Sequence, residues 1–225
     1  MVQIMGIINL TPDSFWVPSR YNYDILRSGA DIIDVGAVST RPGYTPVPME
    51  QEWSRLENFL REYREPTPLS IDTTNSEIVR RAYQIVGPFI VNDISAGEAD
   101  PEMLPLVGEL GLEYIAMHSH PMSGIGEVME YFRVFSKKAE SAGIKDWILD
   151  PGFGFGKEAR DNLLLLDRLH EFKAFGRRIL VGIADKRFTC GRTEEYHLQA
   201  IRAGAGILRV HDVKKARETA GLSKI

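Results

Sequence analysis

The stretch "DWILDPGFGFGK", residues 146–157, joins a short apolar run to a polar, glycine-rich segment. The apolar part is too short for a helix and is typical of a strand that is buried on both faces. A proline and three glycines follow, which is typical of a loop. Asp150 stands at the junction between the two parts. The stretch therefore indicates a buried strand that ends in a carboxylate and a loop.

The same unit occurs eight times along the chain. Helical patterns lie between most of the runs, for example over residues 49–63, 76–86 and 126–139, where apolar residues recur every three or four positions. Strands that alternate with helices pair in parallel. Eight such units predict an α/β protein with a (β/α)8 TIM barrel and some shortened βα connections, and an open doubly wound sheet is the alternative. The eight runs are residues 3–9, 31–37, 68–73, 88–94, 113–119, 146–152, 179–185 and 206–212.

Composition narrows the classes of function. The 225 residues suit one domain, residues 1–225. A net charge of -4 without a Lys/Arg block argues against nucleic acid as a partner. The sequence has no apolar run of the roughly 18–20 residues that a membrane span needs. Its beginning resembles a strand rather than a signal peptide, and the single cysteine, Cys190, excludes an intrachain disulfide. We therefore expect a cytoplasmic protein that does not act at a membrane.

A (β/α)8 barrel carries its chemistry on the face that is formed by the carboxyl ends of the strands. In this sequence each apolar run stops at groups that form hydrogen bonds or carry charge, and solubility alone would not place them at that end. We therefore expect a functional site on this face. The groups at the strand ends are Asn9, Asp72, Asn92, Asp93, His118, Asp150, Asp185, Lys186, Arg209 and His211.

Asp72, Asn92, Asp150 and Lys186 are expected to face one another across the mouth of the barrel. Two carboxylates, an amide and an ammonium match a flat heterocycle that has several donors and acceptors. The alternative for Asp72 and Asp150 is that each caps the helix that follows it. The convergence of four such groups favours a ligand.

Two pairs of strand-end residues alternate along the chain, so the members of each pair point the same way. Arg209 and His211 are suited to a phosphate or a carboxylate, and the alternative is a salt bridge between Arg209 and a nearby acid. His118 and His120 resemble half of a metal site. No acidic ligand stands beside them at helical spacing, so we do not predict metal binding there. The lone Cys190 is interpreted as an ordinary thiol rather than a nucleophile.

Seven stretches in this order, "MGIINLTPDSF", "GAVSTRPG", "SIDT", "VNDIS", "DPGFGFGK", "VGIADK" and "RVHDV", resemble the dihydropteroate synthase family from Met5 to Val213. The resemblance implies a (β/α)8 barrel that is usually a homodimer. It implies the condensation of 7,8-dihydropterin-6-ylmethyl diphosphate with 4-aminobenzoate in folate biosynthesis. The products would be 7,8-dihydropteroate and diphosphate, and Mg²⁺ would be the cofactor.

The resemblance also assigns roles to residues. It implies that the pterin ring is held by Asp72, Asn92, Asp150 and Lys186. It implies that the diphosphate is bound by Asn9, Arg209 and His211, with Asn9 and Asp13 near the magnesium. The aminobenzoate pocket would be shaped by Ser39, Thr40 and Arg41 and lined by Phe155 and Lys157. Catalysis would depend on Lys186, Asp150, Arg209 and His211.

One segment departs from the family pattern. After the seventh strand the family usually has Ser-Arg-Lys-Ser, whereas this chain has "ADKR", residues 184–187. Lys186 is kept, but Arg187 replaces a serine that usually caps a helix next to the aminobenzoate carboxylate. Two alternatives to a synthase therefore remain open. One is a relative that binds pterin or diphosphate without condensation, and the other is a pterin-dependent methyltransferase, against which "TPDSF" and the Arg209/His211 pair argue.

Overall fold

The computed structural model describes residues 1–11, 23–38, 47–184 and 186–222, without the side chain of Arg187. Some of the predicted site residues therefore lie outside the described part of the chain. They are Asp13, Ser39, Thr40, Arg41 and Asp185.

Eight parallel strands form one sheet in the order β6-β5-β4-β3-β2-β1-β8-β7. The two ends of this sheet meet, because Leu149 of β6 forms a parallel bridge with Ile179 and its N–H donates to the carbonyl of Arg178 at 2.9 Å. The sheet is thus a (β/α)8 barrel, as predicted, and the doubly wound alternative is wrong. The strands are β1 (Gln3–Asn9), β2 (Ile32–Gly36), β3 (Leu69–Asp72), β4 (Ile90–Asp93), β5 (Glu113–Met117), β6 (Trp147–Asp150), β7 (Leu180–Val181) and β8 (Ile207–Val210).

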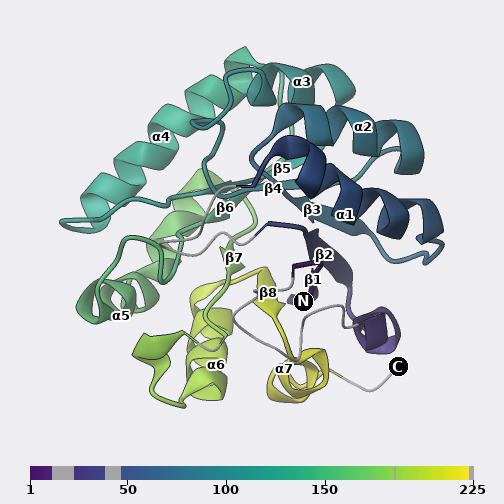
Figure 1. Cartoon of the computed structure of the whole chain (residues 1–225). Helices are drawn as coiled ribbons and strands as arrows, with labels where there is room; N and C mark the ends of the chain where they lie inside the picture. The colour runs from purple at the N-terminus through teal and green to yellow at the C-terminus, as the bar shows by residue number, and fades with distance from the viewer. Residues whose placement is uncertain (12–22, 39–46, 185, 223–225) are drawn as a thin grey trace.

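Helices surround the barrel, with α1 to α4 on one side and α5 to α7 on the other (Figure 1). The predicted helices over residues 49–63, 76–86 and 126–139 agree closely with α1, α2 and α4. In the described part of the chain, none of the helices has the length and apolar character that crossing a membrane requires. The helices are α1 (Met49–Glu62), α2 (Ser76–Val86), α3 (Met103–Leu110), α4 (Ile125–Ser141), α5 (Ala159–Asp167), α6 (Thr193–Ala203) and α7 (Val213–Thr219).

Helix α2 shows how local sequence sets the helix boundaries. Asn75 precedes the helix, and its side chain accepts a hydrogen bond from the N–H of Glu77 at 2.9 Å. Ile78, Val79 and Ala82 are buried on one face of the helix. The helix ends at Gly87, whose φ of 71° is easily adopted only by glycine.

The connection between β1 and β2 is short, as predicted. Its described part contains a 3-10 helix of five residues, η2 (Tyr23–Arg27), where a barrel usually has an α-helix. Ile25 is the buried residue of this turn, and it lies next to Gly6 of β1, where an added Cβ would be 2.8 Å from the Ile25 side chain. The close approach of a small helix to a glycine lets a short connection cover the first strand.

The interior of the barrel nearer the amino ends of the strands is filled by an apolar cluster of residues from seven strands. All of its members are buried. We call this cluster the floor of the barrel, because the polar side chains described below lie between it and the carboxyl ends of the strands. This arrangement matches the layered interior that is typical of (β/α)8 barrels. The cluster consists of Met5, Ile32, Ile90, Ile115, Ile148, Leu180 and Ile207.

Candidate active site

A polar layer lies directly above the apolar floor. Side chains two residues apart on a strand point to the same side. In four of the seven strands that supply a floor residue, β2, β4, β6 and β8, the side chain two positions later is polar or charged. Asp34, Asn92, Asp150 and Arg209 follow the floor residues of β2, β4, β6 and β8 in this way. The register also places Asp72 of β3 opposite Asn92. The strand period therefore brings the predicted residues Asp72, Asn92, Asp150 and Arg209 to one level of the barrel, together with Asp34.

Asp34 lies at the centre of this layer and is fully buried. Its Oδ1 accepts a hydrogen bond from Ser70 Oγ at 2.7 Å. Its carboxylate accepts from Asn92 Nδ2, which lies 3.2 Å from both oxygens. Its Oδ2 also accepts from Arg209 Nε at 2.7 Å. Sequence analysis missed Asp34 and Ser70 because they lie inside strands rather than at strand ends. The signal that could have found them is a charged and a polar residue within otherwise apolar runs.

Arg209 forms two buried ion pairs. Its Nη2 lies 2.6 Å from Asp34 Oδ2 and 2.8 Å from Asp72 Oδ2. These carboxylates raise the pKa of Arg209 against the opposing effect of burial. The sequence-based alternative of a salt bridge thus describes Arg209 in this structure. Nη1 takes no part in these two ion pairs, and a diphosphate contact by Arg209 stays a prediction.

Asp72 presents one oxygen that has no hydrogen-bond partner among the described residues. Its Oδ2 is held by Arg209, whereas its Oδ1 is buried and unpaired. Burial raises the pKa of Asp72 to about 7, with Arg209 acting in the opposite direction and Asp34 adding to the rise. Asp72 does not cap the following helix, because Asn75 does. An unpaired buried acceptor is costly without a ligand, which favours the binding interpretation.

Asp150 closes the turn that follows β6. Its Oδ1 accepts from the N–H of Gly152 at 2.8 Å, and the cap of the next helix, α5, is Glu158. The helix-capping alternative is therefore wrong for Asp150 as well. Burial raises the pKa of Asp150 to about 6, and the charges of Arg209, Lys157 and Lys186 limit the rise.

Lys186 reaches the same region from the segment after β7. Its Nζ lies 4.4 Å from the centre of the Phe155 ring. Burial lowers the pKa of Lys186 to about 8, helped by the charge of Arg209, so the ammonium form still prevails at neutral pH. Gly154 has a φ of 76° and lies where an added Cβ would be 2.9 Å from the Lys186 side chain. The glycine thus leaves room for the lysine.

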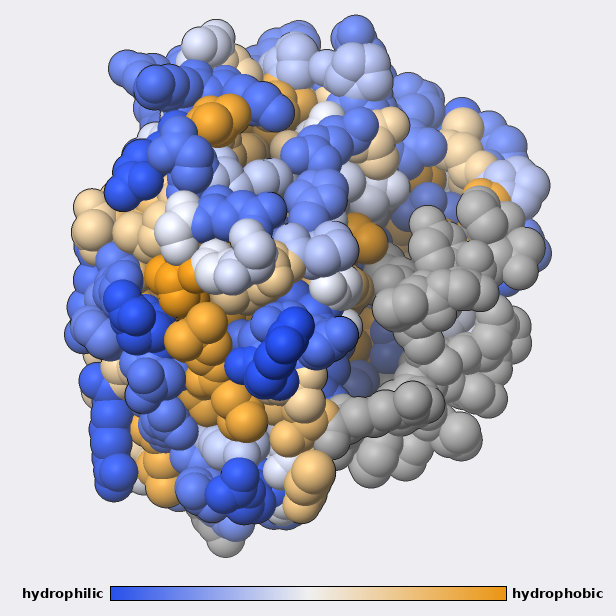
Figure 2. Space-filling view, turned by 90° about the vertical axis from the view of Figure 1, so that its left-hand side faces the viewer, coloured by the Kyte–Doolittle hydropathy of each residue, from blue (hydrophilic) through white to orange (hydrophobic). Residues whose placement is uncertain are grey.

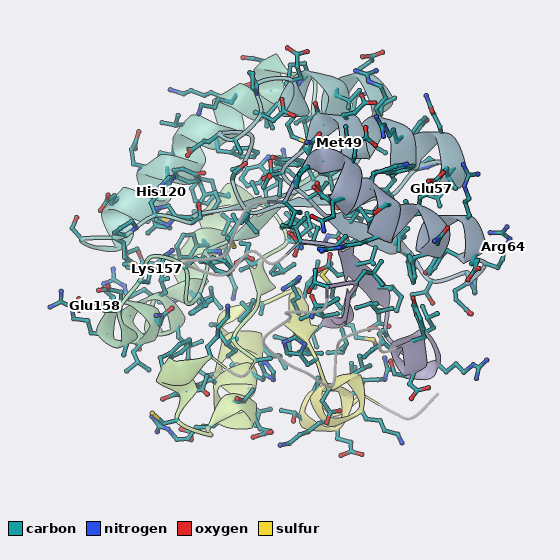
Figure 3. The ribbon with its side chains drawn as sticks, viewed as in Figure 1. Met49, Glu57, Arg64, His120, Lys157 and Glu158 are labelled. Carbon is teal, nitrogen blue, oxygen red and sulfur yellow. The ribbon has the colours of Figure 1, made fainter. Side chains whose placement is uncertain are left out.

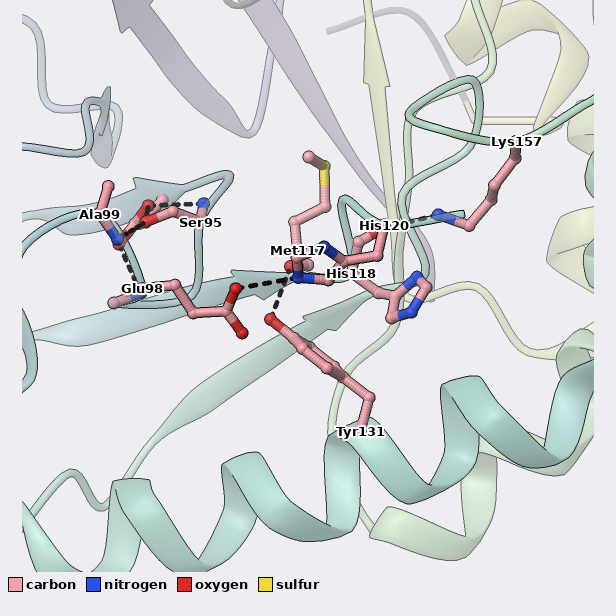
Figure 4. Close-up of polar contacts among 10 residues, drawn as sticks. Ser95, Glu98, Ala99, Met117, His118, His120, Tyr131 and Lys157 are labelled. Atoms are coloured by element: carbon pink, nitrogen blue, oxygen red, sulfur yellow. Dashed lines mark hydrogen bonds and ion pairs between the residues drawn. The ribbon is translucent and has the colours of Figure 1, made fainter. Parts of the chain in front are cut away.

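Lys157 holds the loop that follows β6. Its Nζ donates to the carbonyls of His118, Gly152 and Phe155 at 2.7, 3.1 and 3.0 Å. Figure 4 shows Lys157 directed at the backbone next to His118. Burial lowers the pKa of Lys157 to about 8. These contacts tie the loop to β5, and contact of Lys157 with a ligand stays a prediction.

His120 and Lys157 lie on the side of the barrel that α4 and α5 flank (Figure 3). His120 Nε2 lies 2.9 Å from Glu98 Oε2. His118 is buried and packs edge-on against Tyr131 with ring centres 4.8 Å apart, and burial lowers its pKa to about 4. Across the described ranges, no three His, Cys, Asp or Glu side chains are grouped to hold a metal ion.

Asn9 and His211 are the remaining described residues of the predicted diphosphate site. Asn9 ends β1, and His211 follows β8 two residues after Arg209. Burial and the charges of Arg209 and Lys186 lower the pKa of His211 to about 3, so its ring is neutral near pH 7. Both residues lie at the carboxyl ends of adjacent strands, because β1 pairs with β8.

The chain matches one protein family over most of its length. The family is described as "Pterin binding enzyme", and the match covers residues 5–211. Dihydropteroate synthase from Synechocystis sp. is 35% identical over 254 residues, which cover 94% of this chain and 85% of that protein. Dihydropteroate synthase from Escherichia coli is 36% identical over 250 residues, which cover 96% of this chain and 88% of that protein.

Solved structures of similar proteins agree with the fold. A Xanthomonas albilineans dihydropteroate synthase with 4-aminobenzoic acid has a TM-score of 0.86 and 32% identity, covering 98% of this chain and 91% of that chain. The Anaplasma phagocytophilum dihydropteroate synthase with bound 6-hydroxymethylpterin-monophosphate has a TM-score of 0.85 and 28% identity, covering 98% and 97%.

Proposed function

Because this chain belongs to the family of pterin-binding enzymes, we propose that it is a dihydropteroate synthase. It condenses 7,8-dihydropterin-6-ylmethyl diphosphate with 4-aminobenzoate to give 7,8-dihydropteroate and diphosphate, a step of folate biosynthesis. The observation that carries the proposal is the polar layer of the barrel. There Asp72, beside Asn92 and Arg209, offers a buried oxygen that has no hydrogen-bond partner among the described residues.

The pterin ring binds in this layer. Its N–H groups are donors, and the carboxylates of Asp72 and Asp150 are acceptors that are already placed at the mouth of the barrel. Lys186 supplies a donor and a positive charge from the opposite side. The ligands that relatives hold, pterin phosphate and pteroic acid, support this assignment.

The diphosphate lies above β1 and β8. Asn9 and the neutral His211 bind it, and Nη1 of Arg209 faces it while Nε and Nη2 stay on the carboxylates. Mg²⁺ fits this end of the site, because Asn9 supplies an oxygen and Mg²⁺ in proteins is often held by one or two side chains and by substrate phosphates. Asn9 and Asp13 are the residues that would hold it. When bound, Mg²⁺ neutralises charge on the departing diphosphate.

The protein acts mainly by positioning and by electrostatics. The bond between the pterin methylene carbon and the diphosphate oxygen breaks, and the oxygen keeps the electron pair. The electron-rich pterin shares the positive charge left on carbon, and the nearby Asp150 carboxylate favours that charge. The amine of 4-aminobenzoate then forms the new C–N bond and loses a proton. No residue of the protein needs to form a covalent bond with the substrate.

4-Aminobenzoate binds beside Phe155. The ring of Phe155 is part-buried and lies under Lys186, so it offers an apolar face at the edge of the pterin site. Thr40 and Arg41, which lie outside the described residues, would shape the outer part of this pocket. A bound 4-aminobenzoic acid in one similar protein supports this part of the proposal.

The proposed assembly is a cytoplasmic homodimer. Large hydrophobic side chains are exposed on neighbouring helices, namely Leu163 and Leu164 of α5 and Leu198 of α6. Figure 2 shows hydrophobic surface among charged residues on the side of the molecule where α4 and α5 lie. Apolar surface of this kind is typical of an interface, and it supports a contact through these helices.

Diphosphate release tests the proposed function. The protein is incubated with pterin diphosphate and 4-aminobenzoate, and with each substrate omitted in turn. Release that requires the protein, both substrates and Mg²⁺ is expected. Pterin binding without release would identify a binding protein instead. A need for a corrinoid protein partner would identify a methyltransferase.

A further inference from the structure

Asp34 has no role in the scheme above, although it makes more polar contacts than its neighbours in the polar layer. Its side chain has 0% exposure, so a ligand at the mouth of the barrel does not reach it. It accepts hydrogen bonds from Ser70, Asn92 and Arg209. A buried carboxylate is costly unless it is paired, and here all of its partners come from other strands.

The first consequence concerns the orientation of the Asn92 amide. Nδ2 of Asn92 faces both oxygens of Asp34 at 3.2 Å. The reversed amide would place Oδ1 against a carboxylate, where two acceptors oppose each other. The charge of Asp34 therefore fixes the amide, and Oδ1 lies on the other side of the amide carbon. Asn92 can then meet a ligand with an acceptor.

The second consequence concerns Arg209. Its Nε and Nη2 are held by Asp34 Oδ2, and Nη2 also reaches Asp72 Oδ2. Because Asp34 binds Nε and shares Nη2 of Arg209, the guanidinium contacts only Oδ2 of Asp72. Asp72 Oδ1 therefore has no hydrogen-bond partner among the described residues. Asp72 and Asn92 are opposite each other in the register of β3 and β4. Two acceptors consequently stand side by side.

We propose that Asp34 is a positioning residue that sets the specificity of the pterin pocket. It makes Asn92 and Asp72 present a pair of acceptors, which select the edge of a heterocycle that carries neighbouring N–H donors. A ring that presents carbonyl oxygens at this edge is rejected. This inference rests on the proposed function, because the heterocycle is the pterin.

The test is the affinity of the folded protein for 6-hydroxymethylpterin monophosphate, measured by calorimetric titration. In Asp34→Asn the new amide places donors next to Asn92, so the Asn92 amide turns and offers a donor to the ring. Two donors that face each other leave buried groups unpaired, which predicts a fall in pterin affinity of about fivefold to a hundredfold. Asp31→Asn is the matched control, because Asp31 accepts from the N–H of Ile4 below the floor of the barrel. It should leave the pterin affinity unchanged.

Two further readouts separate positioning from a general structural effect. If Asp34 acts through Asn92, the double variant with Asp34→Asn and Asn92→Ala binds the pterin only slightly more weakly than Asp34→Asn alone. The two losses of affinity are then not additive. The pH midpoint below which pterin binding weakens should also move to lower pH in Asp34→Asn. The groups that surround Asp72 are Arg209, Asp34, Glu52 and Asp93, and the charge of Asp34 raises the pKa of Asp72.

Unchanged pterin affinity in Asp34→Asn, or full additivity with Asn92→Ala, would overturn the proposal. If Asp34→Asn does not fold, Ser70→Ala decides, because it removes one bond to Asp34 and keeps the charge. A loss of pterin affinity of a few fold is expected, roughly what one neutral hydrogen bond contributes, and no loss would overturn the proposal. A parent protein that binds the pterin probe but releases no diphosphate contradicts the synthase assignment alone. A parent that does not bind the probe contradicts both.

Discussion

The ammonium of Lys186 lies over the face of Phe155, with Nζ 4.4 Å from the ring centre. The two residues come from the segments after β7 and β6, so this contact joins the two parts of the site that we propose for the pterin and for 4-aminobenzoate. A cation on an aromatic face contributes about 0.5–2 kcal/mol, more when it is removed from water. Phe155 therefore helps to hold the lysine in place, and in the proposed complex its apolar surface would also contact 4-aminobenzoate.

Lys186→Ala should reduce kcat/KM strongly and leave the fold intact. The substitution removes a charged donor to the pterin, which is worth roughly 1.5–3 kcal/mol, about tenfold to a few hundredfold in rate. Steady-state kinetics and thermal denaturation measure the two effects. Lys137→Ala on the exposed face of α4 is the matched control. Parental turnover in a Lys186→Ala protein that melts like the parent would show that this role is wrong.

Lys157→Met should change both stability and aminobenzoate binding. It removes the Nζ donor from three backbone carbonyls, of which that of Gly152 still accepts from the N–H of Phe155 at 3.2 Å. This loss should lower the free energy of unfolding by about 1–3 kcal/mol. The loop carrying Phe155 then shifts, so the KM for aminobenzoate rises.

Denaturant titration and kinetics with varied aminobenzoate check this, with Lys137→Met as control. If Lys157 instead contacts the substrate, the same KM rises while the stability stays at the parental value.

Asp72 should make the protein more stable as the pH falls. The pKa of Asp72 is raised to about 7 in the folded state, above its usual value of about 4 in an unfolded chain. Between these values the folded state holds more protons, so the contribution is present at low pH and is lost as pH rises through 7. Between about pH 7.5 and about pH 5.5 this adds roughly 1–2 kcal/mol to the free energy of unfolding.

Asp72→Asn removes the titrating group. As the pH falls over the same interval, the free energy of unfolding should therefore increase less in the variant than in the parent. Urea titrations of both proteins at the two pH values give the difference. The other titrating groups, such as His118 and His211, are common to both proteins and cancel. Equal pH dependence in parent and variant would contradict the raised pKa.

Asp72→Asn and Asp150→Asn should each weaken pterin binding more than aminobenzoate binding. An amide places a donor where the ring also donates, which leaves buried groups unpaired at a cost of about 1–3 kcal/mol. Calorimetric titration with a pterin analogue and with aminobenzoate gives both affinities. Unchanged pterin affinity in both variants would remove these residues from the pocket.

Arg187→Ser should maintain or improve aminobenzoate binding without affecting pterin or diphosphate binding. Arg187 stands where the family has a serine, and its side chain lies outside the described part of the structure. An arginine that points to solvent leaves the substrate carboxylate to backbone N–H groups and a helix N-terminus. The KM for aminobenzoate at saturating pterin diphosphate is the measurement. A large rise in the variant would mean that Arg187 itself binds the carboxylate.

The barrel was predictable from sequence because its strands are buried on both faces and therefore read as continuous apolar runs. The helices were predictable from their period, as α1 and α2 show. Strand length was less predictable. The apolar run over residues 179–185 contains a strand of only two residues, Leu180–Val181, because burial of side chains does not require that every residue joins the hydrogen-bonded ladder.

The sequence was sufficient to predict that the site residues lie at the carboxyl ends of strands. The period of two residues gives the side of a strand to which a residue points, so Asp72 and Asn92 could be expected at the barrel mouth. This period does not predict which side chains form hydrogen bonds with one another across the barrel. The pairing of Arg209 with Asp34 and Asp72 joins residues that are 175 and 137 positions apart. The contact of Lys157 with the carbonyl of His118 depends on backbone geometry, which side-chain patterns do not encode.

The most direct test of the synthase assignment is the fate of labelled 4-aminobenzoate. The protein is incubated with pterin diphosphate, Mg²⁺ and isotope-labelled 4-aminobenzoate, and the products are identified by mass spectrometry. Lys186→Ala is the comparison with reduced activity. The label is expected to appear in 7,8-dihydropteroate, one molecule for each diphosphate released. Diphosphate release without labelled dihydropteroate, or no consumption of either substrate by a protein that binds the pterin, would contradict it.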